Sequence, residues 1–441
     1  MKNAIRKVTP NFLLRWYHKV LAVLASVVYR FPSHRLIVIG VTGTNGKTTT
    51  CHMIADMLES SGVVTGLLST IEFRIAKKRW VNATKQGMQG RFQLQKLLRQ
   101  MVKAGCKAVV IEVTSEGIAQ YRHWGIEFSV GVLTNLTPEH IESHGSFQNY
   151  KHAKSELFKN VRQKRRAEFA DIVPTTITNI DSPHSDFFVG IPSRRKWCYG
   201  VEGGHHFTDA NSCDKLFEAN DINLHLSQTE CIIDGMDITI HLPGRMNVYN
   251  ALAAWCVGEV LDISKEKRAL AFKNITTVPG RMEKIEKHGI TVIVDYAHDA
   301  AALENVYETL IDMKSSEGKL IGVLGATGGG RDKEKRPILG KLAAHYCDAF
   351  VLTNDDPYDE PPMEIIHQIE KGVIDKGTKV KNETYWLIED RREAITKALS
   401  IARPGDMVIV TGKGAEEVIV LADGKHPWND KQEVERILSK M

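Results

Sequence analysis

Residues 36–51 read LIVIGVTGTNGKTTTC, an apolar run that leads into a glycine-rich turn and then into Lys47 and Thr48. The run has the composition of a buried strand, and the residues after the turn have helical spacing. In that setting glycines let backbone N–H groups point at phosphate oxygens, the lysine reaches the β- and γ-phosphates, and the threonine hydroxyl is placed to ligate Mg²⁺. Val41 stands where the usual template, G-x-x-x-x-G-K-[ST], has glycine, and Gly40 comes one residue early. The stretch predicts a nucleoside triphosphate site, and the alternative is a chance glycine-rich turn.

The composition is that of an ordinary globular protein. The chain has 441 residues, of which 43% are apolar and 25% charged, enough for roughly two or three domains. The net charge of +5 is small and the basic residues are dispersed apart from short runs at 162–166 and 194–196, which argues against a nucleic acid partner. The seven cysteines are scattered without a C-x-x-C pair, which predicts reduced, mostly buried thiols in a cytoplasmic protein.

The N-terminal segment is unusually apolar. Residues 12–31 are rich in Val, Leu and Ala, but the uninterrupted part, 20–29, is too short to span a bilayer as a helix. No small-residue cleavage site follows, so a signal peptide is not expected. The segment predicts an apolar helix that packs on the protein or on a partner. The alternative is a helix that lies on the inner membrane surface, anchored by Trp16 and Tyr17.

The rest of the chain alternates short β-branched runs with longer helical stretches, which is typical of an α/β fold with a mainly parallel sheet. The predicted strands are 108–112, 129–133, 177–179, 291–295, 320–324, 349–353 and 407–411, and the predicted helices are 94–104, 248–261, 300–313, 339–346, 363–371 and 391–402. Residues 171–228 are predicted to be largely irregular, and the alternation in 235–242 predicts an antiparallel edge.

A domain boundary is predicted near Val278-Pro-Gly280, because a new α/β pattern begins after this turn. The predicted organisation is an apolar helix at 1–34, a central phosphate-loop domain at 35–279 and a Rossmann-like C-terminal domain at 280–441.

Acidic and polar residues follow two of the predicted strands. Glu112 ends an apolar strand downstream of the phosphate loop, where a carboxylate could hold magnesium directly or through water, although a solvated strand end is the alternative. The cluster TNLTPEHIESHG at 134–145 follows the next strand, at the edge where open α/β sheets bind ligands. A lone histidine in such a place is more often structural than a ligand.

Four segments together resemble one family. VTGTNGKTT at 41–49, EVTSEG at 112–117, LTNLTPEHIESHG at 133–145 and YKHAKSELF at 150–158 resemble the Mur ligases, ATP-dependent enzymes that form amide bonds. The resemblance is strongest to the UDP-N-acetylmuramyl-tripeptide synthetase branch and covers about residues 35–435. TGTNGKTT is this family's form of the phosphate loop.

The resemblance implies ATP, a pair of Mg²⁺ ions and specific site residues. The implied catalytic and metal-binding residues are Lys47, Thr48, Glu112, His140 and Lys154, the last of them carbamylated to serve as a ligand of the second Mg²⁺. The implied ATP-binding residues are Gly43, Thr44, Asn45, Gly46, Lys47, Thr48, Thr49, Asn247, Asn250, Arg281, Asp295 and His298. The implied acceptor-binding residues are Asn82, Thr84, Thr114 and Ser115. Glu139 and Glu116 depart from the family pattern of aspartate and histidine, and without the resemblance Lys154 would be taken for a solvated helix lysine.

By the same resemblance, segments of the C-terminal domain are expected to bind the amino acid that is added. The implied amino-acid-binding residues are Arg331, Asp355, Asp356, Tyr358, Gly412 and Glu416. Enzymes of this branch that add meso-diaminopimelate usually carry arginine where Tyr358 stands, a guanidinium suited to bidentate capture of the distal carboxylate. Acidic residues surround the position here, which favours lysine or another amine-ended amino acid. Ala415 replaces the histidine of the family's GKGHE segment.

The implied reaction joins an amino acid to a carboxylate through an acyl phosphate, in peptidoglycan precursor synthesis. Family members of this branch carry about a hundred residues ahead of the phosphate loop that hold the uridine nucleotide, and only about thirty-five precede the loop here. The expected acceptor is a UDP-muramyl peptide held mainly by the central domain, or a related carboxylate, and a different, lipid-linked acceptor is left open. We expect a cytoplasmic monomer or weak oligomer that binds no nucleic acid, with contact between residues 12–31 and the inner membrane surface as an alternative.

Three other functions remain open. Folylpolyglutamate synthetases share the phosphate loop, but DYAH at 295–298 and GRME at 280–283 favour the muramyl branch. An ATP-binding subunit of an amidotransferase is disfavoured because related subunits carry a zinc ribbon of four cysteines that is missing here. A non-catalytic membrane scaffold with a phosphate loop would depend on the N-terminal helix.

Overall fold

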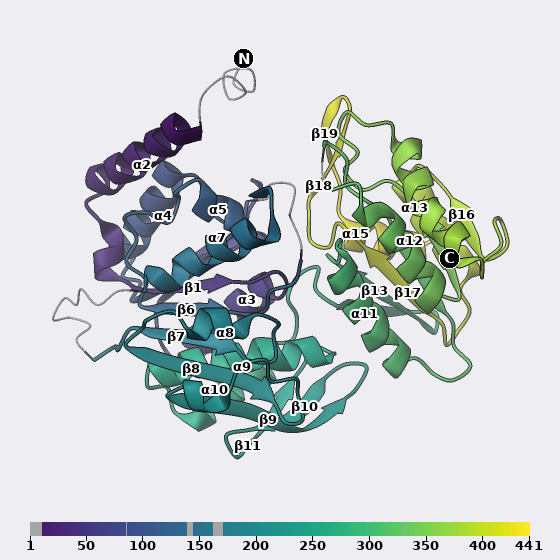
Figure 1. The fold of residues 1–441 in the computed structure, drawn as a ribbon. Helices are drawn as coiled ribbons and strands as arrows, with labels where there is room; N and C mark the ends of the chain where they lie inside the picture. The colour runs from purple at the N-terminus through teal and green to yellow at the C-terminus, as the bar shows by residue number, and fades with distance from the viewer. Residues whose placement is uncertain (1–10, 85, 139–143, 162–170, 331) are drawn as a thin grey trace. The chain divides into compact units, whose positions relative to one another are not determined.

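The computed structural model describes residues 11–84, 86–138, 144–161, 171–330 and 332–441. The chain divides into two compact units (Figure 1). Unit 1 comprises the chain up to Ile222 together with Cys231–Thr239 and Asn247–Ile275, and unit 2 comprises Asn223–Glu230, Ile240–Met246 and Thr276–Met441. The domain limits at residues 34 and 279 stay predictions.

The larger sheet, most of which belongs to unit 1, has the phosphate-loop strand β1 in its interior, between β6 and β5. Among the described residues it contains 11 strands in the order β11-β10-β9-β8-β7-β6-β1-β5-β2-β3-β4. They are β1 (Ile37–Thr42), β2 (Thr65–Leu68), β3 (Glu72–Ile75), β4 (Lys78–Val81), β5 (Ala108–Glu112), β6 (Val130–Leu133), β7 (Thr175–Asn179), β8 (Arg195–Val201), β9 (Lys215–Leu224), β10 (Thr229–Ile233) and β11 (Met236–Ile240). β1 pairs in parallel with both β5 and β6, and its residues are all buried, as expected of a parallel strand covered on both faces. The predicted α/β fold with a mainly parallel sheet is confirmed.

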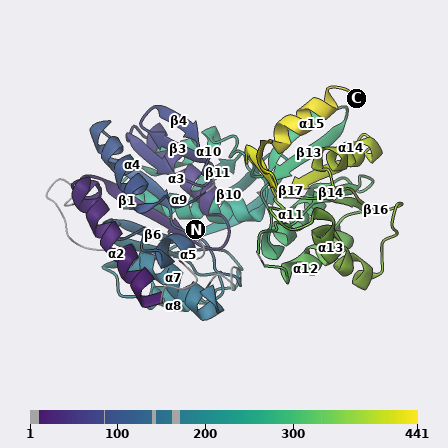
Figure 2. The same ribbon diagram turned by 90° about the horizontal axis from the view of Figure 1, so that it is seen from above.

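Helices cover both faces of this sheet. They are α2 (Asn11–Val28), the short η1 (Pro32–Arg35), α3 (Lys47–Ser60), α4 (Arg91–Lys103), α5 (Ser115–Ala119), α7 (Phe147–Lys159), α8 (Ser185–Val189), η3 (Ala210–Ser212), α9 (Arg245–Val260) and α10 (Lys265–Asn274). α4, α5 and α7 gather on one face, and α3, α9 and α10 on the other (Figure 2). No helix among the described residues combines the length and the hydropathy that crossing a bilayer requires.

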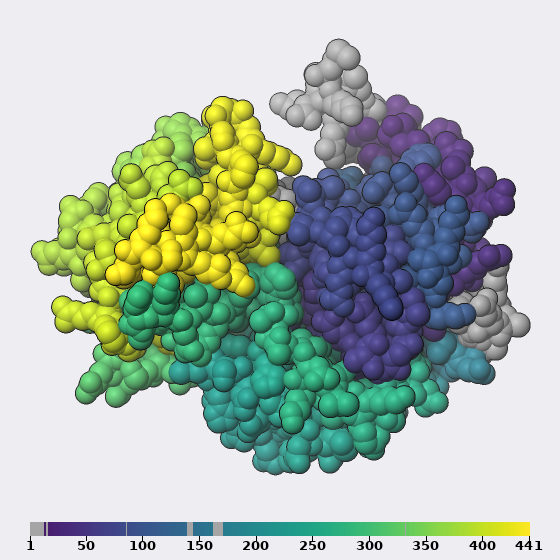
Figure 3. Space-filling model, turned by 180° about the vertical axis from the view of Figure 1, so that it is seen from behind, coloured from purple at the N-terminus to yellow at the C-terminus, as the bar shows by residue number. Residues whose placement is uncertain are grey.

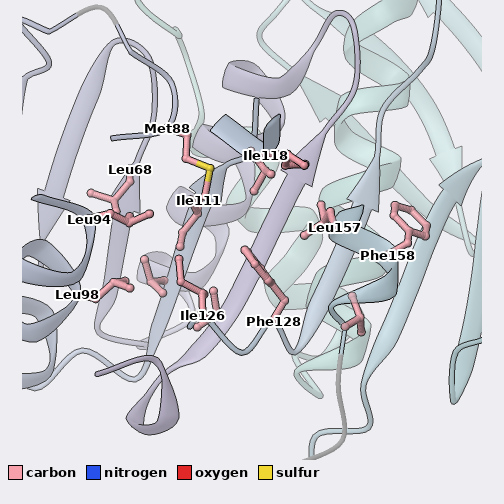
Figure 4. Packing of buried hydrophobic residues seen from close by; sticks show 14 of the residues in the cluster. Leu68, Met88, Leu94, Leu98, Ile111, Ile118, Ile126, Phe128, Leu157 and Phe158 are labelled. Carbon is pink, nitrogen blue, oxygen red and sulfur yellow. The ribbon is translucent and has the colours of Figure 1, made fainter. Parts of the chain in front are cut away.

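The core beneath α4, α5 and α7 positions the ends of the central strands. Leu94 and Leu98 of α4 meet Ile111 of β5 in one layer of apolar side chains, which continues to Leu157 and Phe158 of α7 (Figure 4). The spacing of the α4 leucines places them on one face of the helix, which explains why this helix was predictable. Because Ile111 directly precedes Glu112, packing in this layer determines where that carboxylate lies.

Unit 2 is built on a second sheet, with strand order β12-β13-β17-β14-β15-β16, and a separate hairpin of β18 and β19. The strands are β12 (Glu283–Lys287), β13 (Ile290–Asp295), β14 (Leu320–Leu324), β15 (Ala349–Leu352), β16 (Tyr385–Leu387), β17 (Met407–Thr411), β18 (Val418–Leu421) and β19 (Gly424–Pro427), and the helices are α11 (Ala300–Met313), α12 (Lys335–Tyr346), α13 (Pro362–Lys376), α14 (Arg391–Ile401) and α15 (Asp430–Leu438). β12 is antiparallel to β13, and the other neighbours pair in parallel. α11, α12 and α13 pack into one apolar cluster, and α14 and α15 into another.

Two expectations about unit 1 were wrong. Residues 171–228 are not largely irregular, because β8 and β9 pair in parallel there. The prediction failed because polar residues stand next to the buried residues of these strands, so the sequence shows no clear apolar run. Not all seven cysteines are free, because Cys198 and Cys213 form a disulfide. The turn before β9 returns the chain to β8 and brings their Cα atoms to 6.0 Å, a proximity that cysteine spacing does not reveal. The other five cysteines are buried and free, as predicted.

A buried ion pair between Arg391 and Asp430 is expected to stabilise unit 2. Arg391 Nε and Nη2 donate to the Asp430 carboxylate at 2.8 and 2.7 Å, and both side chains are fully buried. We expect Arg391→Met to lower the free energy of unfolding by about 3–5 kcal/mol, because Asp430 would keep only the hydrogen bond from Trp428 Nε1. Urea denaturation measures this change. The neighbouring variant Arg392→Met removes a half-exposed pair with Glu433 and should cost less than about 1 kcal/mol. Equal losses would contradict the prediction.

Candidate active site

The phosphate loop connects β1 to α3. Gly46 has φ +79°, and a Cβ at this position would lie 2.5 Å from Asn250 Oδ1, so both the backbone conformation and the space require glycine. α3 begins at Lys47, directly after the loop, and its first backbone N–H groups have no partner within the helix. The strand, turn and helix that the motif requires are therefore present, and the helix N-terminus is a suitable site for phosphate.

The segment after β6 holds this loop in place. Asn45 N donates to Asn135 Oδ1 at 2.8 Å, and Thr134 Oγ1 donates to Asn45 O at 2.6 Å. Thr44 N donates to Asn135 O at 3.0 Å. The Thr-Asn pair that follows β6 therefore braces the phosphate loop, a role that the sequence did not indicate.

Lys47 lies folded over the loop. Its Nζ donates to Thr44 O at 2.6 Å, and the side chain is partly exposed. A phosphate oxygen can replace this carbonyl, since both accept the same hydrogen bond and the anion adds charge attraction.

Glu112 is held by two threonines at the carboxyl end of β5. Only 2% of its surface is exposed, and Thr48 Oγ1 donates to its Oε2 at 3.0 Å. Thr70, in the turn after β2, donates from its hydroxyl to Oε1 and from its N–H to Oε2, both at 2.9 Å. Sequence reasoning missed Thr70, although it follows a strand that is hydrogen-bonded to β5 and therefore ends at the same edge.

These oxygens fit a magnesium ion. A carboxylate and a threonine hydroxyl are the donor types that Mg²⁺ prefers, and it usually completes its shell with water and phosphate. The charge of Glu112 is felt nearby, since burial raises the pKa of Cys51 and Glu112 raises it further, against the effect of Lys47. Within the described ranges, no three His, Cys, Asp or Glu side chains gather as a metal site.

Lys154 of α7 points at the same loop. It is 2% exposed, its Nζ donates to Gly43 O at 2.5 Å, and it lies 4.4 Å from the centre of the Tyr150 ring. The Tyr150 hydroxyl is 3.2 Å from Thr44 Oγ1. Burial lowers the pKa of His144, and the charge of Lys154 lowers it further. Lys154 is therefore a buried residue beside the phosphate loop, unlike the solvated helix lysine that its position alone would suggest.

The predicted acceptor residues lie on two segments near Glu112. Asn82 Oδ1 accepts hydrogen bonds from Thr84 N and Thr84 Oγ1, at 3.0 and 2.6 Å. A Cβ on Gly87, which belongs to the same loop, would lie 3.1 Å from Glu112 Oε1 and 2.8 Å from Thr114 Cγ2.

Thr114 also begins α5, because its Oγ1 accepts from Gly117 N at 3.1 Å, and the adjacent Ser115 is 4% exposed. The structure thus brings the predicted acceptor segments to the Glu112 end of the sheet.

The two asparagines of α9 face α3. Thr50 Oγ1 donates to Asn250 Oδ1 at 3.0 Å, and Asn250 Nδ2 donates to Asn247 Oδ1 at 3.0 Å. Since a Cβ on Gly46 would lie 2.5 Å from Asn250 Oδ1, the Asn250 side chain lies next to the phosphate loop, with Asn247 beside it. Their binding of ATP stays a prediction.

The remaining predicted ATP residues lie in unit 2. Asp295 ends β13 and accepts from Met282 N and Ala297 N, at 2.8 and 2.7 Å. Burial raises the pKa of Asp295, and the charge of Arg281 opposes this shift. The Arg281 guanidinium lies 4.4 Å from the centre of the Tyr296 ring, and His298 Nδ1 is 3.0 Å from Tyr296 O.

The predicted amino-acid residues surround Lys413 in unit 2. Lys413 Nζ is 2.6 Å from Asp356 Oδ1, 2.5 Å from Glu416 Oε2 and 3.7 Å from Asp355 Oδ1. Burial opposes the charged form of Lys413, but the three carboxylates outweigh it and raise its pKa. Three carboxylates around one ammonium leave a negative excess at this site. Sequence reasoning missed Lys413, although it lies inside the recognised GKGAE segment.

Two neighbouring positions complete this cluster. Gly412 has φ +109°, and a Cβ there would lie 2.9 Å from Asp355 Oδ2. Tyr358 N donates to Val420 O at 3.2 Å, and a Cβ on Gly329 would lie 2.9 Å from the Tyr358 ring. His140, Glu139 and Arg331 lie outside the described residues.

Comparison with known proteins supports one family. Residues 41–258 match the model of the Mur ligase middle domain, and residues 280–414 match that of the Mur ligase glutamate ligase domain. The UDP-N-acetylmuramyl-tripeptide synthetase of Roseiflexus sp. (strain RS-1) is 34% identical over 432 residues, which cover 96% of this chain and 82% of that protein. The UDP-N-acetylmuramoyl-L-alanyl-D-glutamate–2,6-diaminopimelate ligase of Clostridium tetani is 35% identical with the same coverage.

Solved structures agree with this likeness. A UDP-N-acetylmuramoyl-L-alanyl-D-glutamate–2,6-diaminopimelate ligase superposes with a TM-score of 0.59 at 27% identity, over 92% of this chain and 78% of that one. A folylpolyglutamate synthase from Mycobacterium tuberculosis, solved with ADP, gives a TM-score of 0.70 at 16% identity over 89% of this chain and 91% of that one, a likeness of fold alone.

Proposed function

This chain belongs to the Mur ligase family, and on that premise we propose that it is an ATP-dependent, ADP-forming ligase of peptidoglycan precursor synthesis. It joins an amino acid to the carboxylate of a UDP-muramyl peptide or a closely related acceptor. The observation that carries the proposal is the convergence of Lys47, Thr48, Glu112 and Lys154 on one phosphate loop.

The reaction follows from the groups at this loop. Lys47 and the N–H groups of α3 hold the phosphates, while Thr48 and Glu112 would hold Mg²⁺, which neutralises phosphate charge when bound. An acceptor carboxylate oxygen attacks the γ-phosphorus, and the bond to the β–γ bridging oxygen breaks to give an acyl phosphate and ADP. The amine nitrogen then attacks the acyl carbon and loses a proton, and the amide forms as phosphate leaves.

Lys154 is proposed to be carbamylated in the working enzyme. A carbamate converts its ammonium into an anion with two oxygens, the ligand type that Mg²⁺ takes. The supporting observation is the burial of Nζ at Gly43 O, in the loop that receives the phosphates. His140 would complete this second magnesium site.

The carboxylate cluster of unit 2 bears on the added amino acid. Asp355, Asp356 and Glu416 leave negative charge beyond that of Lys413, which favours a ligand with an amine. Diaminopimelate, which the names of several relatives specify, carries a second carboxylate, and Tyr358 offers no cation for it. We therefore propose lysine, or another diamino acid without a distal carboxylate, as the substrate.

Phosphate release across a matrix of substrates tests this assignment. With ATP, Mg²⁺ and UDP-N-acetylmuramoyl-L-alanyl-D-glutamate, we expect turnover that requires an amino acid and is roughly tenfold faster with lysine than with diaminopimelate. Tyr358→Arg should shift the preference toward diaminopimelate, because a guanidinium pairs with the distal carboxylate.

Three outcomes of the matrix would count against the proposal. A wild-type preference for diaminopimelate would refute the lysine assignment while leaving the ligase reaction intact. Turnover that depends on glutamine or ammonia would replace ligation by amidation. Turnover with a folate and glutamate would instead indicate a folylpolyglutamate synthetase.

The cellular setting follows from the substrates. ATP and UDP-linked acceptors are cytoplasmic, so the enzyme is proposed to work in the cytoplasm as a monomer or weak oligomer. Residues 12–31 are proposed to contact the inner membrane surface peripherally.

A further inference from the structure

α2 has two different faces. Its inner face carries Ala22, Ala25 and Ser26, which are all buried, and the helix contacts α4. Its outer face carries apolar side chains that are 41–68% exposed: Trp16, Tyr17, Val20, Val23, Leu24, Val27 and Val28. We call these seven residues the outer face of α2. The helix lies on the surface of unit 1, drawn in dark purple in Figure 3.

The outer face is a continuous stripe. Its members recur at steps of three and four residues, which places them along one side of the helix, and 18 residues span about 27 Å. Single exposed apolar residues are normal on a protein surface, as at Leu270 of α10, but a contiguous apolar stripe usually marks an interaction site.

The charged residues of the N-terminal segment and of α4 are all basic. Residues 1–35 contain seven Lys and Arg residues and no Asp or Glu, and the first acidic residue of the chain is Asp56. α4, against which α2 packs, adds Arg91, Lys96, Arg99 and Lys103 and contains no acid. Arg30 and Arg35, at the end of α2 and in η1, are exposed, and no ion pair forms at either within the part of the chain that the structure describes.

We infer that the outer face of α2 docks on a bilayer that presents anionic headgroups, with the helix lying in the plane of the interface. This inference rests on the proposed membrane contact of residues 12–31 and identifies its residues and its lipid chemistry. Apolar side chains enter the boundary between headgroups and acyl chains, where Trp16 and Tyr17 suit the headgroup level. Arg30, Arg35 and the basic residues of α4 supply the attraction to anionic lipid. Charge complementarity favours this partner over a second copy of the chain, whose outer face would bring like charges together.

A neighbouring cavity does not contribute. It measures about 580 Å³, and its lining includes Glu127 and Glu156, which lie 3.1 Å from His34 Nε2 and 2.8 Å from Lys159 Nζ. Because these charged groups pair with one another, the cavity supplies no excess positive charge for a phosphate headgroup, and the docking surface is the outer face of α2 alone.

Vesicle co-sedimentation of the full chain, without nucleotide or acceptor, tests the inference. We expect binding to vesicles of phosphatidylglycerol and phosphatidylcholine, and roughly tenfold weaker binding to phosphatidylcholine alone or in 0.5 M salt. Leu24→Glu combined with Val27→Glu should also weaken binding roughly tenfold or more, because both side chains would place charge in the apolar boundary. Leu270→Glu, at an apolar residue exposed to 60% outside this face, is the matched control and should bind like the wild type.

A second pair of variants and two further readouts separate the outcomes. Arg30→Glu with Arg35→Glu should weaken binding to anionic vesicles while leaving the apolar stripe intact. Unchanged thermal midpoints show that each variant is folded. The inference would be overturned if the wild-type protein did not bind anionic vesicles. It would also be overturned if gel filtration showed a dimer that the Leu24→Glu, Val27→Glu variant dissociates. Ligase turnover measured with a soluble acceptor reports separately on the proposed function.

Discussion

Replacing Lys47 with alanine is expected to lower the rate of ADP formation about a thousandfold, on the scale of removing a cation that stabilises a phosphoryl-transfer transition state. Lys47 is the cation of the loop that follows the β1 strand, and its Nζ already lies 2.6 Å from Thr44 O. In the transition state the same Nζ would neutralise charge on the transferred group. A thousandfold loss corresponds to about 4 kcal/mol of activation free energy.

The measurement is single-turnover ADP formation at saturating ATP, which separates chemistry from binding. Lys47→Arg is a useful companion because it keeps the charge but changes the reach and geometry of the donor, so it should retain part of the rate. Lys265→Ala, on α10 in the same unit, removes an exposed ion pair with Asp234 and should leave the rate unchanged. If Lys47→Ala turned over within tenfold of the wild type, the phosphate loop would not be the catalytic ATP site.

The fold was predictable in the segments where buried side chains recur with the spacing of a helix or a strand. The run at β1 is apolar throughout because that strand is covered on both faces, and the leucines of α4 recur at helical spacing because one side of that helix meets the core. β9 was not predictable in this way, because it carries many polar residues and only some of its side chains are buried. The hairpin of β3 and β4 was missed for the same reason, since the four residues of β4 are all exposed or only half buried.

The site was predictable where one segment carries its own chemistry. The loop from Gly43 to Thr48 carries a recognisable phosphate-binding motif, and Glu112 ends a strand that its apolar run predicts. Thr70 and Tyr150 were missed because their roles arise only when separate segments meet: Thr70 reaches Glu112 across β2 and β5, and Tyr150 reaches Thr44 from α7. The role of a threonine or tyrosine hydroxyl cannot be recognised from the sequence until the group that it hydrogen-bonds is known. Lys413 was missed because two of its three carboxylate partners, Asp355 and Asp356, follow a different strand, β15.

Lys154 is a buried lysine on a helix whose other lysines lie away from the phosphate loop. Its helix gives no sign that the side chain is buried, since α7 has lysines at 151, 154 and 159 and only the middle one points at the loop. The resemblance to the Mur ligases singled out this lysine, and the structure places its Nζ at Gly43 O. A substitution series at this position distinguishes an ammonium that braces the loop from a carbamate that holds a metal.

Lys154→Ala should lower ligase turnover about a thousandfold, Lys154→Arg should fail to the same extent, and acetate should restore part of the alanine variant's activity. The physical reason is that arginine preserves the positive charge but cannot form a carbamate, whereas a small carboxylate can occupy the space that alanine leaves and supply the missing oxygens. Bicarbonate should not restore the activity of Lys154→Ala, because this variant has no amine for it to react with.

Incorporation of ¹³C from labelled bicarbonate detects the carbamate directly, and this signal should be absent in Lys154→Ala. Lys151→Ala, on the same helix, is the control that should keep full activity and the ¹³C signal. If Lys154→Arg were active, the buried cation itself would be the working group, and the carbamate would be ruled out.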